Sequence, residues 1–132
     1  MASRIGEIIV DCADPEEAAA FWCAALDYRI VERGGTEVTI AGHSGAPTIL
    51  FDVSPDVKLH KNRIHFDIHP IDTTQAEEVS RLVDLGARLI DIGQTDASWV
   101  VMEDPTGNEF CVMSTEHPTD LELPDAGGHA TE

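Results

Sequence analysis

Two imidazoles and a carboxylate occupy alternate positions in one short stretch of the sequence. His65, Asp67 and His69 follow one another at every second residue, with Ile64 among the apolar residues between them. Such alternation is typical of a β-strand with one apolar and one polar face, and it predicts a strand over residues 62–70. The three polar side chains could bind a metal ion or transfer protons. An ordinary solvated sheet face is the competing interpretation, because antiparallel sheets often have one wet side.

His65 has the widest range of possible roles in this stretch. It could be a hydrogen-bonded core histidine, a metal ligand, or a general base tuned toward neutral pH by Asp67 or Glu7. Glu7 lies in a second alternating stretch, which predicts another strand over residues 5–11. We therefore take His65 and Glu7 as the candidate catalytic residues.

The alternation rule puts further side chains on the same side of the expected sheets. For Arg63, Asp67 and Glu109 we expect a buried or rim ion-pair network that closes the cupped sheets, ahead of a catalytic role. Trp99 could form a flat apolar wall for a ligand ring. The candidate pocket residues are Asp11, Arg63, Asp67, Trp99 and Glu109.

The composition limits the classes of partner. A chain of 132 residues can form one domain with a buried core, without disulfides or a structural metal. Its formal net charge of −17, from 25 acidic and 8 basic residues, makes nucleic acid and anionic membrane surfaces poor partners, whereas a cationic ligand would suit it. No apolar run approaches the roughly 20 residues of a membrane span. The three cysteines form no C-x-x-C pair, which predicts reduced thiols and a cytoplasmic protein.

The first half of the chain predicts a strand, a helix and three more strands. Asp14 suits the N-cap of a helix, Pro15 suits its first turn, and Glu17 stands three residues after the cap. The helix should end near Leu26, with Trp22 in the apolar stripe that packs it against a sheet. The three strands that follow are predicted over residues 28–32, 37–41 and 47–53.

The second half repeats this order. A second helix is expected from an N-cap at Asp72 to a terminal glycine at Gly86. Glu7 precedes Asp14 by seven residues, and His65 precedes Asp72 by the same number. Strand, helix and three strands therefore form a module that occurs twice. The last three strands are predicted over residues 88–90, 98–102 and 109–113.

These elements predict an α+β fold of two β-α-β-β-β modules, which form cupped mixed sheets with the helices on their outer faces. The modules, about residues 5–53 and 62–114, make one domain over residues 1–116, and residues 117–132 form a flexible acidic tail. One module alone cannot bury both faces of its curved sheet, so two modules must pair, within one chain or between two. We expect a homodimer, with the functional cavity between paired modules.

Three local strings resemble one known family. They are DCADP at residues 11–15, KNRIHFD at residues 61–67 and DPTGNEFC at residues 104–111. Together with the repeated module they resemble the vicinal oxygen chelate superfamily of glyoxalases, bleomycin-resistance proteins, fosfomycin-resistance enzymes and extradiol dioxygenases. The strings are similar to those of its glyoxalase-like domain subgroup. The resemblance implies a cavity in the cupped sheets and a small-molecule ligand or substrate.

The resemblance also implies a set of metal ligands. In metal-using members, side chains on the first and last strands of the modules hold a divalent ion, and here these positions offer Glu7, His65 and Cys111. A glutamate is usual at the position of Cys111, and the fourth position, near Leu50, is apolar. Zinc is the ion most compatible with a thiolate in the set. Because the set is incomplete, we expect a site without metal ahead of one with zinc.

Three functional hypotheses follow. The first is a glyoxalase-like small-molecule enzyme, a lyase or isomerase with His65 as base or ligand and Glu7 as its partner. The alternative is a metal-free protein that binds and sequesters a small compound, as bleomycin-resistance proteins do. The third is a degenerate structural module whose cup is filled by its own side chains.

Overall fold

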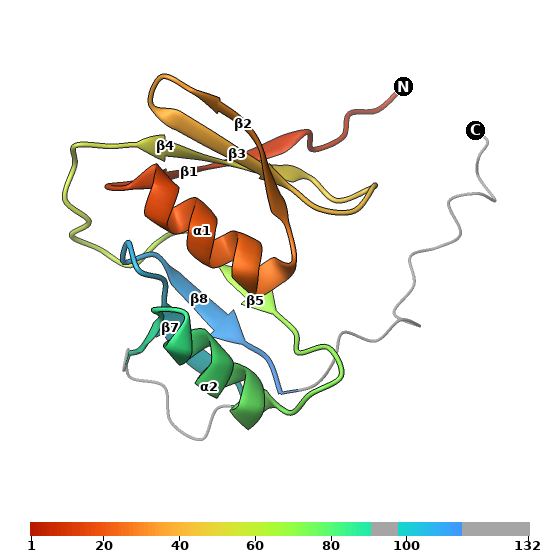
Figure 1. Cartoon of the computed structure of the whole chain (residues 1–132), viewed down its shortest axis with the longest axis vertical. Helices are drawn as coiled ribbons and strands as arrows, with labels where there is room; N and C mark the ends of the chain where they lie inside the picture. Colours follow the sequence, from red (N-terminus) through yellow and green to blue (C-terminus); the bar gives the residue numbers. More distant parts are fainter. Residues whose placement is uncertain (91–97, 115–132) are drawn as a thin grey trace.

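The chain folds as two successive modules with the same order of elements (Figure 1). The computed structural model of the protein describes residues 1–90 and 98–114. The first module consists of β1 (Glu7–Cys12), α1 (Pro15–Leu26), β2 (Arg29–Gly34), β3 (Glu37–Ala41) and β4 (Thr48–Val53). The second module consists of β5 (Phe66–Ile68), α2 (Gln75–Asp84), β6 (Arg88–Leu89), β7 (Val100–Glu103) and β8 (Glu109–Val112).

Each module forms one mixed sheet of four strands. The strand orders are β1-β4-β3-β2 and β5-β8-β7-β6, so equivalent strands occupy equivalent places. In each sheet the first and last strands of the module pair in parallel, and the other neighbours are antiparallel. The topology confirms the predicted α+β fold of two β-α-β-β-β modules.

Helix α1 begins and ends where the sequence predicts. The Asp14 side chain accepts a hydrogen bond from the backbone N–H of Glu17 at 3.2 Å, and Pro15 occupies the first turn. An aspartate cap and an N-terminal proline satisfy or remove amide groups that have no partner within the helix. After Leu26 the chain leaves the helix at Asp27, which has a positive φ of 60°.

The core of the first module continues into the second through α1. Phe21 and Trp22 of this helix are buried in one cluster with Phe51 of β4. The Trp22 ring also lies edge-on to Phe66 of β5 and to Phe110 of β8, with ring centroids 5.5 and 5.0 Å apart. The prediction that Trp22 is a core residue is confirmed. Its neighbours in the second module mean that the two modules of one chain pack together through α1.

The other face of the first sheet is open. Along β1 the side chains of Ile8 and Val10 are half-buried, whereas Glu7, Ile9 and Asp11 are exposed. This is the alternation that the sequence predicts for a strand with one face in the core. Glu7 and Asp11 therefore lie on the open face of the sheet.

The strand predicted over residues 62–70 is wrong in length, since β5 covers only its middle. The parallel partner β8 begins at Glu109, directly after a turn, so the chain before β5 has little strand to pair with. Asn62 donates its backbone N–H to the side chain of Glu109 instead. Ile64, expected in the core, is 79% exposed.

The predicted cap of the second helix is also wrong. Helix α2 has its N-cap at Thr74, whose hydroxyl accepts the backbone N–H of Glu77 at 3.1 Å. The Glu77 carboxylate in turn accepts the backbone N–H of Thr74, which completes a capping box. Asp72 has a φ of 59°, in the left-handed region and not in the extended region of an N-cap. The predicted terminal glycine is confirmed, because Gly86 follows the helix with a φ of 117°.

The repeat therefore holds in its order of elements but not in its spacing. The cap of α1 follows Glu7 by seven residues, whereas the cap of α2, at position 74, follows His65 by nine. The later strands begin or end within two residues of their predicted bounds. The predicted tail over residues 117–132 lies outside the described residues. Within the described part of the chain, no helix is long and apolar enough to cross a membrane.

Candidate functional site

Three side chains that can bind a metal gather at the second sheet. The imidazole Nε2 of His65 lies 3.2 Å from Oδ1 of Asp67. Cys111 of β8 is the register partner of Asp67 of β5, so the thiol and the carboxylate project from neighbouring strands. One donor atom of each residue lies within 4.8 Å of the other two. We call this group the His65–Asp67–Cys111 cluster.

The cluster has a buried side and an open side. The side chains of His65 and Asp67 are 37% and 50% exposed, whereas Cys111 is only 8% exposed. A water molecule or a small ligand can therefore approach the imidazole and the carboxylate, with the thiol beneath them.

The environment of Cys111 favours its protonated form. Burial raises the pKa of the Cys111 thiol, and the negative charge of Asp67 raises it further, while the Lys61 ammonium opposes the shift. Both causes disfavour the thiolate, which is the nucleophilic and metal-binding form. Without a bound cation the thiol is therefore neutral and is a poor nucleophile.

The donor chemistry of the cluster fits zinc. Imidazole nitrogen, carboxylate oxygen and thiolate sulfur are all zinc ligands, and three protein ligands with one open position are typical of catalytic zinc sites. Donor atoms that lie within 4.8 Å of one another can reach a shared ion through small side-chain rotations. Magnesium and manganese prefer oxygen ligands and fit the thiol poorly.

The cluster differs in one member from the ligand set taken from the resemblance. Glu7 begins β1 in the first sheet and is not part of the cluster. Asp67 stands in its place; the alternating row of His65, Asp67 and His69 made it a possible ligand, but it was absent from the set implied by the resemblance. The signal for Asp67 was present, since it shares the alternating face of His65 and stands opposite Cys111 once the parallel register of β5 and β8 is known.

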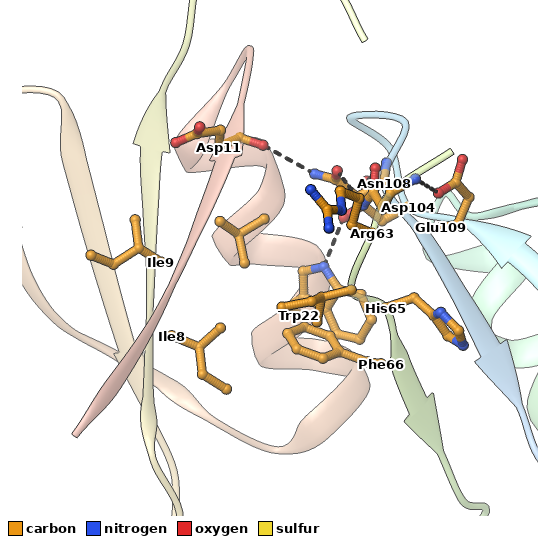
Figure 2. Close-up of a pocket in the computed structure, with 13 residues that line it drawn as sticks. Ile8, Ile9, Asp11, Trp22, Arg63, His65, Phe66, Asp104, Asn108 and Glu109 are labelled. Atoms are coloured by element: carbon orange, nitrogen blue, oxygen red, sulfur yellow. Dashed lines mark hydrogen bonds between the residues drawn. The ribbon is translucent and has the colours of Figure 1, made fainter. Parts of the chain in front are cut away.

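A cavity of about 360 Å³ lies where β1 and α1 meet the second module (Figure 2). Its lining combines apolar side chains of both modules with a few polar groups, as is typical of small-molecule sites. Among the predicted site residues, those that line the cavity are Asp11, Arg63, His65 and Glu109. The predicted site residues outside its lining are Glu7, Asp67, Trp99 and Cys111.

His65 marks the boundary between the cavity and the cluster. It belongs to the cavity lining, yet Figure 2 shows its ring pointing away from β1, toward β8. Trp99 precedes β7 and is 42% exposed. The cavity and the cluster are thus neighbouring features that meet at one residue.

Asp104 is a buried carboxylate at the cavity, and no functional role was predicted for it beyond its place in the string at residues 104–111. It is fully buried, and its Oδ2 accepts a hydrogen bond from the indole Nε1 of Trp22 at 2.8 Å. Its Oδ1 accepts hydrogen bonds from the backbone N–H and hydroxyl of Thr106 and from the backbone N–H of Asn108. Asn108 also donates its side-chain amide to the Asp11 carbonyl of β1. The turn before β8 therefore links both modules.

Glu109 is held by the segment that connects the modules. Its carboxylate accepts the backbone N–H of Asn62 at 2.8 Å and forms an ion pair with Lys58. Burial alone would raise the pKa of Glu109, but the hydrogen bonds from Lys58 and Asn62, with the charges of Lys58 and Lys61, outweigh it and lower the pKa. Glu109 is therefore an ionised anchor for the connecting segment.

Arg63 is in a different situation from the other charged residues of the cavity. Its side chain is exposed and lines the cavity. No hydrogen bond or ion pair joins its guanidinium to any residue within 1–90 and 98–114. Its charge is available to a ligand.

Solved structures with the same fold come from several bacteria. A glyoxalase/bleomycin resistance protein/dioxygenase family enzyme from Burkholderia phytofirmans is 17% identical, with a TM-score of 0.65 over 83% of this chain and 97% of that one. A possible glyoxalase from Bacillus cereus is 20% identical, with a TM-score of 0.62 over 85% and 99% of the two chains. A mutant of the fosfomycin resistance protein FosX from Listeria monocytogenes is 14% identical, with a TM-score of 0.64 over 87% and 92%. That FosX mutant was solved in complex with Mn(II) and 1S,2S-dihydroxypropylphosphonic acid.

At these identities the structural neighbours establish a shared fold. No curated protein matches this sequence. The family model described as the glyoxalase-like domain matches residues 7–113, a span that includes all the strands and helices from β1 to β8. The resemblance to the vicinal oxygen chelate superfamily is therefore confirmed, and the chain belongs to the glyoxalase-like domain family.

Proposed function

We propose that this chain is a small-molecule enzyme in which His65, Asp67 and Cys111 hold a divalent metal ion, with zinc as that ion. One observation carries the proposal: an imidazole, a carboxylate and a thiol converge within 4.8 Å, with the first two open to solvent. The Mn(II) in the complex of the FosX neighbour supports metal use within this fold.

When bound, zinc would polarise a substrate oxygen or a coordinated water molecule. The protein groups contribute the remaining chemistry. His65 can serve as a zinc ligand or as a base, because a ring nitrogen that binds the ion cannot take up a proton. In the absence of the ion, if Nε2–H donates a hydrogen bond to Oδ1 of Asp67, 3.2 Å away, Nδ1 is left unprotonated and could accept a proton from a substrate. Asp67 thus takes the partner role that the sequence analysis gave to Glu7. Isomerase, lyase and other proton-transfer reactions are the class that such a site supports.

A second candidate is a metal-free binding protein. The cavity of about 360 Å³ supports it, because Asp67 and Cys111 do not belong to its lining. In this case His65 would act only as a wall of the cavity, and the neutral Cys111 thiol would be a packing residue.

We also propose a homodimer. Ile9 of β1 and Val31 of β2 are large apolar side chains exposed on the first sheet, and a second copy could cover them. Analytical ultracentrifugation of the wild type and of Ile9→Glu tests this: a dimer that becomes a monomer supports it, and a wild-type monomer overturns it. The three free thiols support a cytoplasmic site of action.

The test of the metal proposal is elemental mass spectrometry after exposure to zinc and removal of the excess. We expect near-stoichiometric zinc in the wild type and its loss in His65→Ala and Asp67→Asn. His60→Ala is the matched control, because His60 is exposed and outside the cluster. Wild-type protein without zinc, or equal zinc in all variants, would overturn the proposal and favour the binding protein.

A further inference from the structure

Arg63 is an arginine without a protein partner, among the described residues, at the edge of a partly apolar cavity. Three other arginines are engaged in ion pairs with glutamates, namely Arg33, Arg81 and Arg88. Arg63 makes no such contact with the described part of the chain, and it lines the cavity beside Ile64 and Phe66. In a chain with 25 acidic residues, an arginine that stays unpaired at a cavity is free to bind a ligand.

Two of the three acidic side chains that line the cavity have hydrogen-bond or ion-pair partners other than Arg63. The Asp104 carboxylate receives four hydrogen bonds from Trp22, Thr106 and Asn108. Glu109 is paired with Lys58. The carboxylate of Asp11 remains, and Figure 2 shows it on the side of β1 away from Arg63.

Of the two lysines in the segment before β5, Lys58 is paired with Glu109, so Lys61 is the further cation near Arg63 in the sequence. Lys58, Lys61 and Arg63 lie within six consecutive positions, and they are three of the 8 lysines and arginines of the chain. Of the three, Arg63 lines the cavity, and this cluster of positive charge in the sequence contrasts with the net charge of −17 for the whole chain. At physiological ionic strength charges are screened beyond roughly 8 Å, so a ligand in the cavity senses the charges beside it more than the distant acidic surface.

The apolar part of the lining limits the rest of the ligand. Ile8 and Val10 of β1 line the cavity together with Ile64 and with Phe66 of β5. These side chains form aliphatic and aromatic walls with few hydrogen-bonding groups. A compact apolar group of the ligand would fill the space between these side chains. A polar group in the same place would lose its hydrogen bonds to water without gaining new ones from the protein.

We propose that this cavity binds a small amphipathic anion, whose carboxylate or phosphonate pairs with Arg63 and whose apolar body lies against Ile8, Val10 and Phe66. The guanidinium matches the geometry of such oxyanions with two parallel N–H donors. This inference extends the proposed function. It rests on that function in one respect, namely that the bound anion is the substrate of the enzyme. It replaces the cationic ligand that the overall charge suggested.

The test compares 1-naphthoate with neutral 1-naphthamide by NMR on the full chain, after treatment with a chelator and again with zinc. Trp22 belongs to the cavity lining and its indole N–H gives a separate signal, whereas Trp99 lies outside the lining and is an internal control. We expect naphthoate to shift the Trp22 signal with little effect on Trp99, and to bind at least about tenfold more tightly than the amide. Arg63→Gln should abolish this preference for the acid.

Arg29→Gln is the matched control, because Arg29 is an exposed arginine of the edge strand β2 and its loss changes the net charge equally. An unchanged Trp22 signal in ligand-free Arg63→Gln shows that the fold is retained. Equal affinity for acid and amide, retention of the preference in Arg63→Gln, or no shift of Trp22 at millimolar naphthoate would overturn the inference. Arg63-dependent binding after chelation would support the anion site even if zinc never binds, so the two proposals fail separately.

Discussion

The indole Nε1 of Trp22 donates a hydrogen bond of 2.8 Å to Oδ2 of Asp104, across 82 positions of the sequence. Both residues are buried, and they belong to different modules. The bond therefore fixes α1 of the first module against the turn that precedes β8 of the second. This contact stabilises the junction at which the cavity lies.

Asp104→Ala should destabilise the protein by about 3 kcal/mol, because it leaves the buried indole N–H and the amides of the turn without an acceptor. Asp104→Asn should cost less, since its amide oxygen can still accept the three donors that Oδ1 now receives. Urea unfolding measures both values. Equal stability of wild type and Asp104→Ala would contradict the role of this carboxylate.

Thr74→Ala should cost about 1 kcal/mol, because it removes the hydroxyl that accepts the Glu77 N–H at the start of α2. Ser80→Ala, at an exposed position of the same helix, is the control and should be neutral or slightly stabilising. Thermal unfolding of the wild type and of both variants measures the two changes in stability. A Thr74→Ala protein as stable as Ser80→Ala would count against the capping box.

The ion pair of Glu109 predicts a pH dependence of stability. A carboxylate whose pKa is lower in the folded than in the unfolded state stabilises the fold above the unfolded value, and this contribution is lost as the pH falls through the folded value. The stability difference between wild type and Glu109→Gln should therefore be full at neutral pH and shrink below the ordinary value of 4.5. Urea titrations across this range measure it, with exposed Glu32→Gln as the control. A difference that stays constant with pH would refute the proposed role of the Lys58 contact.

Zinc affinity should rise with pH if Cys111 is a ligand. Burial and the charge of Asp67 raise the pKa of this thiol, so at neutral pH zinc must displace its proton. Displacement of one proton predicts about a tenfold gain in affinity per pH unit below the thiol pKa. Competition with a chromophoric chelator gives the slope of the logarithm of zinc affinity against pH. In Cys111→Ser this slope should be smaller by one proton released per zinc bound. The same slope in both proteins would exclude the thiolate.

Much of the fold could be predicted from local patterns. Helix α1 was predictable because its cap, its first proline and its apolar stripe all lie within one short segment. The alternation along β1 likewise reported its two faces correctly. These features depend on near neighbours in the sequence, which a single chain displays directly.

The errors arise where distant residues decide the structure. The extent of β5 depends on where β8 begins, and the side chain of Glu109 captures the backbone of Asn62 that alternation assigned to a strand. Asp72 had the residue type of a cap, but the reciprocal bonds of Thr74 and Glu77 outcompete it.

The candidate site divides in the same way. His65 and Cys111 were predictable as cluster members from the resemblance, and the cavity residues Asp11, Arg63 and Glu109 from alternation. The place of Asp67 in the cluster required the register between β5 and β8. The buried acceptor role of Asp104 required the approach of α1 from the other module, which no local pattern contains.

The most direct test of the metal proposal is the absorption spectrum of the protein loaded with cobalt(II) in place of zinc. A Cys111 thiolate bound to the ion predicts an intense sulfur-to-cobalt charge-transfer band in the near ultraviolet. That band should be absent in Cys111→Ser and unchanged in Cys23→Ser, whose cysteine lies on α1 away from the cluster. No such band in the wild type, or a band that survives Cys111→Ser, would contradict a metal centre formed by His65, Asp67 and Cys111.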